Sequence, residues 1–247
     1  MLTHLEKQTF IIGKFNQVID ALLQNLQEKS TSKIILPCSL NDLALQTDNK
    51  HKQFYKNIDF CTNDSMLITF FLRHKHKTLI DRVYGPDLMK AVLAKTSKNQ
   101  IKLKHYFLAP NKDSMQKLAA YFDKNYPQMN YKLNFLPSNI TKEEEIVYLK
   151  KTLTSQVNFI WIGIGSPKQI TLAYWLKTHS SGINIMCVGA AFAFISGHKK
   201  QAPNWIRKSG LEWLFRLISE PKRLWKRYLI AIPKYLISLI LRCAFRL

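Results

Sequence analysis

The chain has 247 residues and a formal net charge of +21, and 47% of its residues are hydrophobic. That hydrophobic fraction supports a full core and excludes wholesale disorder. The positive charge favours a polyanionic partner, which could be nucleic acid, an anionic membrane surface or a phosphate-rich substrate. The cysteines lie far apart without a CxxC pair, which indicates reduced, mostly buried thiols instead of a disulfide framework or a zinc site (Cys38, Cys61, Cys187 and Cys243).

Strand and helix patterns alternate along the chain. Apolar runs predict strands at 33–37, 102–110, 130–138, 157–165 and 183–192. Amphipathic spacing predicts helices at 15–26, 87–97, 113–127, 142–155 and 169–179. The apolar segment 66–74 is expected to be buried. This alternation predicts an α/β fold with a mostly parallel sheet covered by helices on both faces.

The composition changes near His198. Residues 199–247 hold 12 Lys and Arg against 2 Glu, which is nearly half of the excess positive charge in a fifth of the chain. We therefore predict a core domain over 1–198 and a basic C-terminal appendage over 199–247. The first ten residues lack the apolar run of a secretory signal, so we expect the protein to stay inside the cell.

One predicted strand ends in the segment GIGSPKQ. In parallel sheets, ligands bind beyond the carboxyl ends of strands, where helix N-termini direct their N–H groups. Gly163 and Gly165 would let the backbone turn sharply and approach a ligand, and Pro167 suits the first turn of the next helix. Lys168 could supply charge to a phosphate. The spacing fits neither a P-loop nor a dinucleotide fingerprint, and a plain strand-to-helix turn with a solvated lysine explains it equally well.

Two further motifs join GIGSPKQ: RVYGPDLM at 82–89 and QAPNWIRKSGLEWLFRLISEPKRLWKRY at 201–228. With these three motifs in order, the chain from about Ser32 to Tyr228 closely resembles the bacterial WecG/TagA/CpsF glycosyltransferase family, glycosyltransferase family 26. The resemblance implies a Rossmann-like core of the GT-E type. It also implies an appendage that helps to close the active site and holds the enzyme, as a peripheral protein, to the cytoplasmic face of the bacterial inner membrane.

The activity that the resemblance implies is an inverting sugar transfer in cell-surface polysaccharide or teichoic-acid-type biosynthesis. The donor would be a UDP-sugar, often of an N-acetylhexosamine such as ManNAc or of its uronic acid. The acceptor would be a sugar linked to a polyprenyl diphosphate. We expect no metal and no other cofactor. We also expect no nucleic-acid partner, because the sequence shows neither a known nucleic-acid-binding motif nor a run of aromatic platforms.

The resemblance also assigns catalytic residues. The family's presumed catalytic carboxylate matches Asp64 in CTNDSML, where it would take the proton of the attacking hydroxyl; by itself, an Asp in TNDS indicates a turn. Arg82 and Gln169 match two further polar positions around the donor site. Arg82 could contact phosphate or orient Asp64, or simply form a salt bridge with Asp81 or Asp87. Gln169 suits sugar hydroxyls or the diphosphate.

The remaining site residues follow the same matches. The predicted donor-binding residues are Gly163, Gly165, Ser166, Pro167, Lys168, Gly189, Arg216, Arg223 and Arg227, and the predicted acceptor-binding residue is Ser39. Members of the family use arginines in the tail to neutralise the leaving diphosphate. The spacing of 7 and 4 places these three arginines on one helix face unless Pro221 breaks the helix. A solvated basic face is the alternative.

The last residues are apolar but are interrupted by Pro233 and Lys234, so no stretch reaches the roughly 20 residues that a membrane-spanning helix needs. We predict one or two interfacial helices whose basic residues meet anionic headgroups. The residues expected at the membrane are Trp225, Tyr228, Lys234 and Arg242. The alternative is a helix that covers an apolar face of the domain.

The chain departs from four features of the family pattern. Ile170 replaces a usual Glu, Ala193 a usual Asp, Ser39 an Asn, and Ala109 with Pro110 a Gly-Gly pair. We interpret these departures as an altered sugar preference. The alternative is a catalytically inactive subunit that binds a UDP-sugar or a polyprenyl phosphate.

Overall fold

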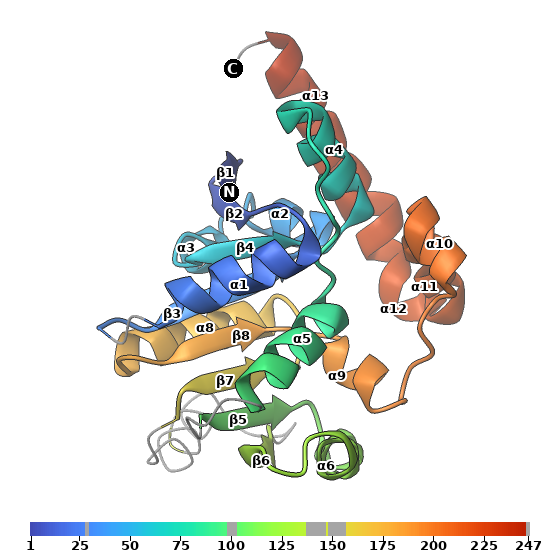
Figure 1. The fold of residues 1–247 in the computed structure, drawn as a ribbon. Coiled ribbons are helices and arrows are strands. Elements are labelled where there is room, and N and C mark those ends of the chain that lie inside the picture. The colour runs from blue at the N-terminus through green and yellow to red at the C-terminus, as the bar shows by residue number, and fades with distance from the viewer. Residues whose placement is uncertain (28–29, 98–102, 137–146, 148–156, 246–247) are drawn as a thin grey trace.

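The computed structural model describes residues 1–27, 30–97, 103–136, 147 and 157–245. These residues contain an eight-stranded sheet in the order β1-β2-β4-β3-β8-β7-β5-β6 (Figure 1). The strands are β1 (Leu2–Leu5), β2 (Gln8–Ile11), β3 (Lys33–Cys38), β4 (Phe60–Asn63), β5 (Lys104–Ala109), β6 (Asn130–Phe135), β7 (Phe159–Ile162) and β8 (Asn184–Cys187). β1 and β2 form an antiparallel hairpin, and all other pairs are parallel. The predicted parallel sheet is confirmed, whereas the edge hairpin and β4 were not predicted.

Helices cover both faces of the sheet (Figure 1). One face packs against α1 (Phe15–Asn25), α5 (Gly85–Ser97), α6 (Lys112–Asn125) and α9 (Ala191–Ile195). The other packs against α2 (Leu40–Leu45), α3 (Lys52–Tyr55), α4 (Met66–His76), α8 (Lys168–His179) and α13 (Ile232–Phe245). In β3, Ile34 and Leu36 point to one layer and Ile35 to the other, and all three are buried. Strands buried on both faces explain the nearly continuous apolar runs in the sequence.

Two predicted elements differ in the structure. The strand expected at 183–192 ends at Cys187, because Gly189 adopts a φ of 53° and turns the chain into α9. The segment 66–74 was expected to be buried, but it forms α4, whose outer apolar side chains are exposed. The helix predicted at 142–155 lies outside the described residues apart from Val147. Cys38, Cys61 and Cys187 are buried free thiols as predicted, and the side chain of Cys243 lies outside the described part.

The C-terminal segment forms a succession of short helices beside the sheet (Figure 1). They are α10 (Asn204–Ser209), α11 (Glu212–Ser219), α12 (Pro221–Trp225), the π-helix η1 (Lys226–Ala231) and α13. Pro221 begins α12, and Glu220 before it has a non-helical conformation, so the predicted break is confirmed. η1 lies just before Pro233, where the missing N–H of the proline favours an irregular turn. Within the described part of the chain, no helix is long and apolar enough to cross a bilayer.

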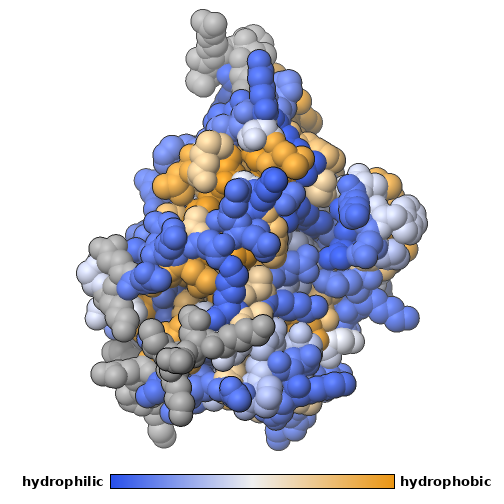
Figure 2. Space-filling view, in the orientation of Figure 1, coloured by the Kyte–Doolittle hydropathy of each residue, from blue (hydrophilic) through white to orange (hydrophobic). Residues whose placement is uncertain are grey.

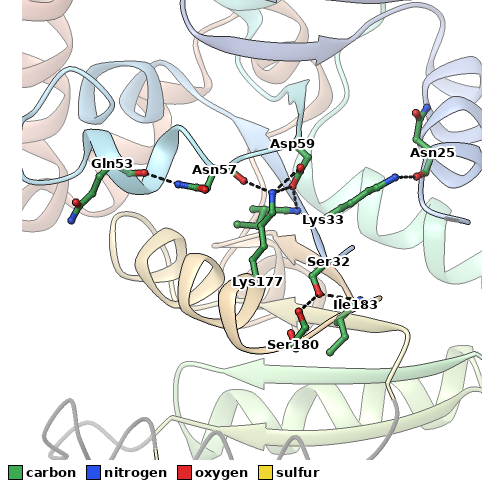
Figure 3. A network of polar contacts seen from close by, with 10 residues as sticks. Asn25, Ser32, Lys33, Gln53, Asn57, Asp59, Lys177, Ser180 and Ile183 are labelled. Carbon is green, nitrogen blue, oxygen red and sulfur yellow. Dashed lines mark hydrogen bonds and ion pairs between the residues drawn. The ribbon is translucent and has the colours of Figure 1, made fainter. Parts of the chain in front are cut away.

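A polar network holds the amino ends of the central strands (Figure 3). The Lys177 Nζ donates to both carboxylate oxygens of Asp59 at 2.7 Å and to the Asn57 carbonyl at 3.0 Å. Asp59 Oδ2 also accepts the backbone N–H of Ile34 at 2.7 Å. These contacts tie the end of α8 to the starts of β3 and β4. They leave the opposite, carboxyl edge of the sheet for a binding site.

A buried histidine in β5 makes the stability of this core depend on pH. The ring of His105 stacks on Phe159 with ring centroids 5.1 Å apart, and its Nδ1 accepts the Trp161 Nε1–H at 3.1 Å. Burial lowers the pKa of His105 to about 4. The pKa of histidine in model peptides is about 6.5. Below that pH the unfolded chain therefore binds more protons than the folded chain does.

We predict that the free energy of unfolding falls by up to about 3 kcal/mol as the pH drops from about 6.5 to about 4. Urea denaturation at a series of pH values would measure this fall. His105→Asn keeps an acceptor for Trp161 without a titrating ring, so its stability should decline much less over the same range. An equal decline in both proteins would contradict the assignment.

Candidate active site

Loops from four neighbouring strands meet at the carboxyl edge of the sheet. Ser39 follows β3, Asp64 follows β4, Ser166 lies in the loop after β7 and Gly189 follows β8. The strands are adjacent in the order β4-β3-β8-β7, so their carboxyl ends lie together. This edge is where parallel α/β sheets bind ligands.

Two cavities lie between these loops and the C-terminal helices. A polar cavity of about 120 Å³ is lined by residues that include Gly165, Ser166, Gln169, Gly189, Arg216, Arg223 and Arg227. An apolar cavity of about 290 Å³ is lined by residues that include Met66, Leu67, Trp213, Tyr228, Ile232, Pro233 and Leu236. Both cavities share Ser39, Asp64, Arg216 and Arg227 as lining residues. The predicted base therefore lies where the two cavities meet.

Local hydrogen bonds fix the position of Asp64. Its backbone N–H donates to the Cys38 carbonyl at 3.1 Å, which joins the ends of β3 and β4. The preceding Asn63 is buried, and its Nδ2 donates to Thr69 Oγ1 at 2.8 Å and to the Asp81 carbonyl at 2.9 Å. The start of α4 and the segment that leads to Arg82 are thus anchored to the same strand end.

The carboxyl group of Asp64 lies in a shielded environment. Its Oδ1 accepts the backbone N–H of Gly85 at 2.8 Å, and its backbone carbonyl accepts from Arg82 Nε. Burial raises the pKa of Asp64, and the Glu212 carboxylate raises it further. The Arg82 and Arg216 guanidinium groups and the Gly85 N–H act in the opposite direction without cancelling the rise. A carboxylate with a raised pKa is better suited to accept a proton near neutral pH.

Arg82 connects this carboxyl group to the C-terminal segment. Its Nη1 lies 2.8 Å from Glu212 Oε2, and both side chains are largely buried. Its guanidinium also lies over the Tyr84 ring, 4.5 Å from the centroid. The alternative salt bridges to Asp81 or Asp87 are not the ones formed. Asp81 accepts the backbone N–H of Phe15, and Asp87 pairs with Arg207. Glu212 was not among the predicted site residues. In the sequence, only its place in the GLEW stretch of the tail motif could have pointed to it.

The three tail arginines line the polar cavity although they lie on three separate helical segments. Arg216 is on α11, Arg223 on α12 and Arg227 on η1, so the break at Glu220 does not separate them. Arg227 Nη2 donates to Ser39 Oγ at 3.2 Å. Glu220 accepts Arg223 Nε at 2.6 Å and Lys199 Nζ at 2.7 Å, and these two cations together lower the pKa of Glu220 to about 2. Of these three arginines, only Arg223, which is 53% exposed, fits the alternative of a solvated basic face.

Part of the GIGSPKQ segment reaches the polar cavity. Gln169 is buried, and its Nε2 donates to Ser166 Oγ at 3.2 Å and to the Cys187 carbonyl at 3.4 Å. Gly165 has a φ of 85° and lines the cavity beside Ser166. A Cβ at Gly189 would lie 3.4 Å from Gln169 Oε1, so the glycine gives this amide its space.

The other part of the segment does not reach the cavity. A Cβ on Gly163 would lie 2.2 Å from the Phe192 ring of α9. The space beside this glycine is therefore filled by that ring and is not open to a ligand. That observation corrects the expectation that Gly163 clears room for the donor. Pro167 follows a cis peptide bond, and Lys168 is exposed at the start of α8. Neither is among the residues lining the two cavities.

The residues predicted at the membrane have different surroundings. Trp225 is 43% exposed, and Lys234 is exposed on α13. Tyr228 lines the apolar cavity, with its ring centroid 6.0 Å from that of Trp213. Arg242 pairs with Glu6 at 3.3 Å and thereby ties α13 to the N-terminal hairpin. The alternative, a helix that covers an apolar face of the domain, applies to part of α13, because its Tyr235 is buried in the core.

Asp42 is a site residue that sequence reasoning missed. Its Oδ2 accepts the N–H of Ser39 at 3.0 Å and its hydroxyl at 2.6 Å, and its Oδ1 accepts Tyr55 Oη–H at 3.0 Å and Ser166 Oγ–H at 2.6 Å. One buried carboxylate therefore holds the loops after β3 and β7 together. The sequence signal is the Ser39-x-x-Asp42 capping box at the start of α2.

We predict that Asp42→Ala lowers the free energy of unfolding by about 3 kcal/mol, because it leaves several buried donors without an acceptor. Asp42→Asn, which keeps one acceptor oxygen, should cost less. Chemical denaturation would measure both changes. The exposed Asp20 offers a control, since Asp20→Ala should stay within about 0.5 kcal/mol of the wild type. A loss in Asp42→Ala no larger than in Asp20→Ala would refute the role of Asp42.

The sequence profile of the Glycosyl transferase WecG/TagA/CpsF family matches residues 8–247. The chain belongs to this family. It is also 25% identical over 193 residues to a protein of Bacillus subtilis (strain 168) named N-acetylglucosaminyldiphosphoundecaprenol N-acetyl-beta-D-mannosaminyltransferase, an alignment that covers 78% of this chain and 73% of the relative. The predicted family is thus confirmed, and the match extends through the C-terminal helices.

Proposed function

We propose that this member of the WecG/TagA/CpsF family transfers an N-acetylhexosamine, such as ManNAc or its uronic acid, from a UDP-sugar to a polyprenyl-diphosphate-linked sugar. The observation that carries the proposal is the position of Asp64 between a cavity lined by arginines and a cavity lined by apolar side chains. The relative is named for transfer of an N-acetyl-β-D-mannosaminyl group to N-acetylglucosaminyldiphosphoundecaprenol. Such a reaction belongs to cell-surface polysaccharide or teichoic-acid-type biosynthesis.

The polar cavity suits the donor. Arg216, Arg223 and Arg227 supply positive charge and fixed N–H donors for a diphosphate, with no metal in the proposal. Ser166 and Gly189 bring the loops after β7 and β8 to the same cavity, where backbone can approach the sugar nucleotide. Gln169 Oε1 is a buried acceptor that lacks a hydrogen bond within the described residues, so it is available to a hydroxyl or amide of the donor.

The apolar cavity suits the acceptor. Its wall combines α4 with η1 and α13, so the isoprenoid part of the acceptor would lie against side chains such as Met66, Ile232 and Leu236. Ser39 lies at the junction of the two cavities, where it would contact the acceptor sugar. Because such an acceptor stays in the bilayer, we assign the enzyme to the cytoplasmic face of the bacterial inner membrane as a peripheral protein.

The proposed reaction is a single displacement. The acceptor hydroxyl oxygen forms a bond to the anomeric carbon while the bond from that carbon to the diphosphate oxygen breaks. The proton of the hydroxyl passes to Asp64 Oδ2, since Oδ1 is held by the Gly85 N–H. The charge that develops on the leaving UDP is stabilised by the arginines. Arg82 holds Asp64 through its backbone carbonyl and does not need to contact the donor.

The alternative, a subunit that binds without turnover, rests on the departures from the family pattern. Ile170 is fully buried in the core, and neither it nor Ala193 lines either cavity. Neither residue therefore forms part of the walls of the proposed site. Ser39 does line both cavities, so it is the departure that we expect to affect which sugar is accepted.

The test is UDP release by the purified chain with a polyprenyl-diphosphate-GlcNAc analogue, with UDP-ManNAc, UDP-ManNAc uronic acid, UDP-GlcNAc or UDP-glucose, and with EDTA present. We expect acceptor-dependent release with one donor, and a rate about 10²-fold to 10⁴-fold lower in Asp64→Asn. Binding of UDP without turnover of any donor would favour the binding subunit. Activity that EDTA abolishes would overturn the metal-independent mechanism.

A second prediction concerns the pH dependence of the same reaction. Glu212→Gln removes a negative charge that raises the pKa of Asp64, so that pKa should fall. Asp64 would then stay deprotonated to lower pH, and the acidic limb of the kcat/KM profile should move to lower pH. Glu6→Gln, which removes a carboxylate paired with Arg242 away from the cavities, should leave the limb in place. An unmoved limb in Glu212→Gln would contradict Asp64 as the titrating group.

A further inference from the structure

Helix α4 is apolar on two opposite faces. Ile68 and Leu72 are buried against the sheet. On the outer side, Leu67, Phe70 and Phe71 follow the i, i+3, i+4 spacing of one helix face and are 44–48% exposed. Packing within the fold explains why the inner face is apolar, but it does not explain the apolar outer face. In Figure 2, apolar side chains gather over the region that α4 occupies in Figure 1. An outer row of large apolar side chains indicates a surface that meets an apolar partner.

The charged residues of α4 and of the turn that follows it are all basic. After this row, α4 ends in His74, Lys75 and Lys77, which are exposed, and Leu79 after them is 63% exposed. The Lys75 Nζ also donates to the His4 carbonyl at 2.9 Å. Residues 65–80 contain no acidic residue. Basic residues in the last turn also stabilise the helix through its dipole, but that effect does not require the neighbouring exposed phenylalanines.

The same composition recurs on the C-terminal helices. Ile237, Ile240 and Leu241 of α13 are 49–65% exposed, and residues 221–247 contain no acidic residue. The two elements border one cavity, because Met66 and Leu67 of α4 line the apolar cavity together with Ile232 and Leu236 of α13. Both α4 and α13 lie at the upper end of the molecule in Figure 1.

We infer that α4 is a second membrane-docking element, which contacts anionic lipid together with the C-terminal helices. We define the α4 patch as Leu67, Phe70, Phe71, His74, Lys75, Lys77 and Leu79. Its apolar row would enter the headgroup boundary while its basic end meets the negative headgroups. The apolar cavity then opens between two elements held at the bilayer, where a lipid-linked molecule can enter it from the membrane. Only this last step rests on the proposed function.

The first test measures binding of the full chain to vesicles by flotation, with no turnover required. Phe71→Ser with Leu79→Ser removes two exposed apolar side chains that line neither cavity. We expect the affinity for phosphatidylglycerol-containing vesicles to fall about tenfold or more. Wild-type affinity in a variant that unfolds at the same temperature as the wild type would overturn the proposal.

The second test separates charge at the patch from charge of the whole protein. Lys75→Gln with Lys77→Gln should weaken binding to the anionic vesicles by about tenfold or more. Lys112→Gln with Lys124→Gln makes the same change in net charge on α6, which Figure 1 shows at the opposite end of the molecule, and should weaken it much less. If the two pairs of substitutions weakened binding equally, the lysines of the patch would act only through the overall charge of the protein, and the inference would be contradicted.

Two further measurements distinguish other outcomes. If the Phe71 and Leu79 variant changes from dimer to monomer by mass photometry while vesicle binding is unchanged, the partner is a second copy of the chain and the membrane proposal fails. If the proposed function is correct, this variant should release UDP normally with a soluble short-chain acceptor and slowly with an acceptor embedded in vesicles. Vesicle binding that depends on the patch without any sugar transfer would instead keep the docking element and reject the proposed function.

Discussion

The buried ion pair between Glu212 and Arg82 is the contact on which the arrangement of the site depends. Arg82 belongs to the segment that runs beside the end of β4, and Glu212 begins α11 of the C-terminal helices. Removing one member of a buried pair leaves an uncompensated charge, so the pair strongly favours the conformation in which both are present. Because Arg82 also holds the Asp64 backbone, closure of the site by the tail and the position of the carboxylate are linked through one side chain.

The sheet supplies the second constraint. Four adjacent parallel strands end at one edge, and the Asp42 carboxylate fastens the loops after β3 and β7 across β8. The polar network around Asp59 and Lys177 holds the other edge. The sheet therefore positions the loops of the site, which do not need regular secondary structure of their own. This arrangement is common for sites in this fold class.

Residue patterns were sufficient for a mostly parallel sheet, for five of its strands and for helices α1, α5, α6 and α8, because strands buried on both faces leave continuous apolar runs. They missed β4 and the short helices α2, α3 and α9. They failed at α4, where apolar residues point outward, since an apolar sequence does not reveal which partner covers it. The family motifs located Asp64, Gln169 and the arginines, all of which line the two cavities. They did not locate Glu212 or Asp42, whose contacts join residues distant in sequence. Gly163 was assigned to ligand space because glycine spacing alone does not distinguish room for a ligand from room for the Phe192 ring.

The shared wall of the two cavities has a thermodynamic consequence. Ser39, Asp64, Arg216 and Arg227 face both spaces, so an occupant of either one changes the surroundings of the other. Binding of the two occupants is then cooperative or anticooperative, and reciprocity requires that each changes the affinity of the other by the same factor. Where the factor exceeds one, filling one cavity prepares the other, and the order in which two ligands assemble follows from their concentrations instead of from a fixed sequence.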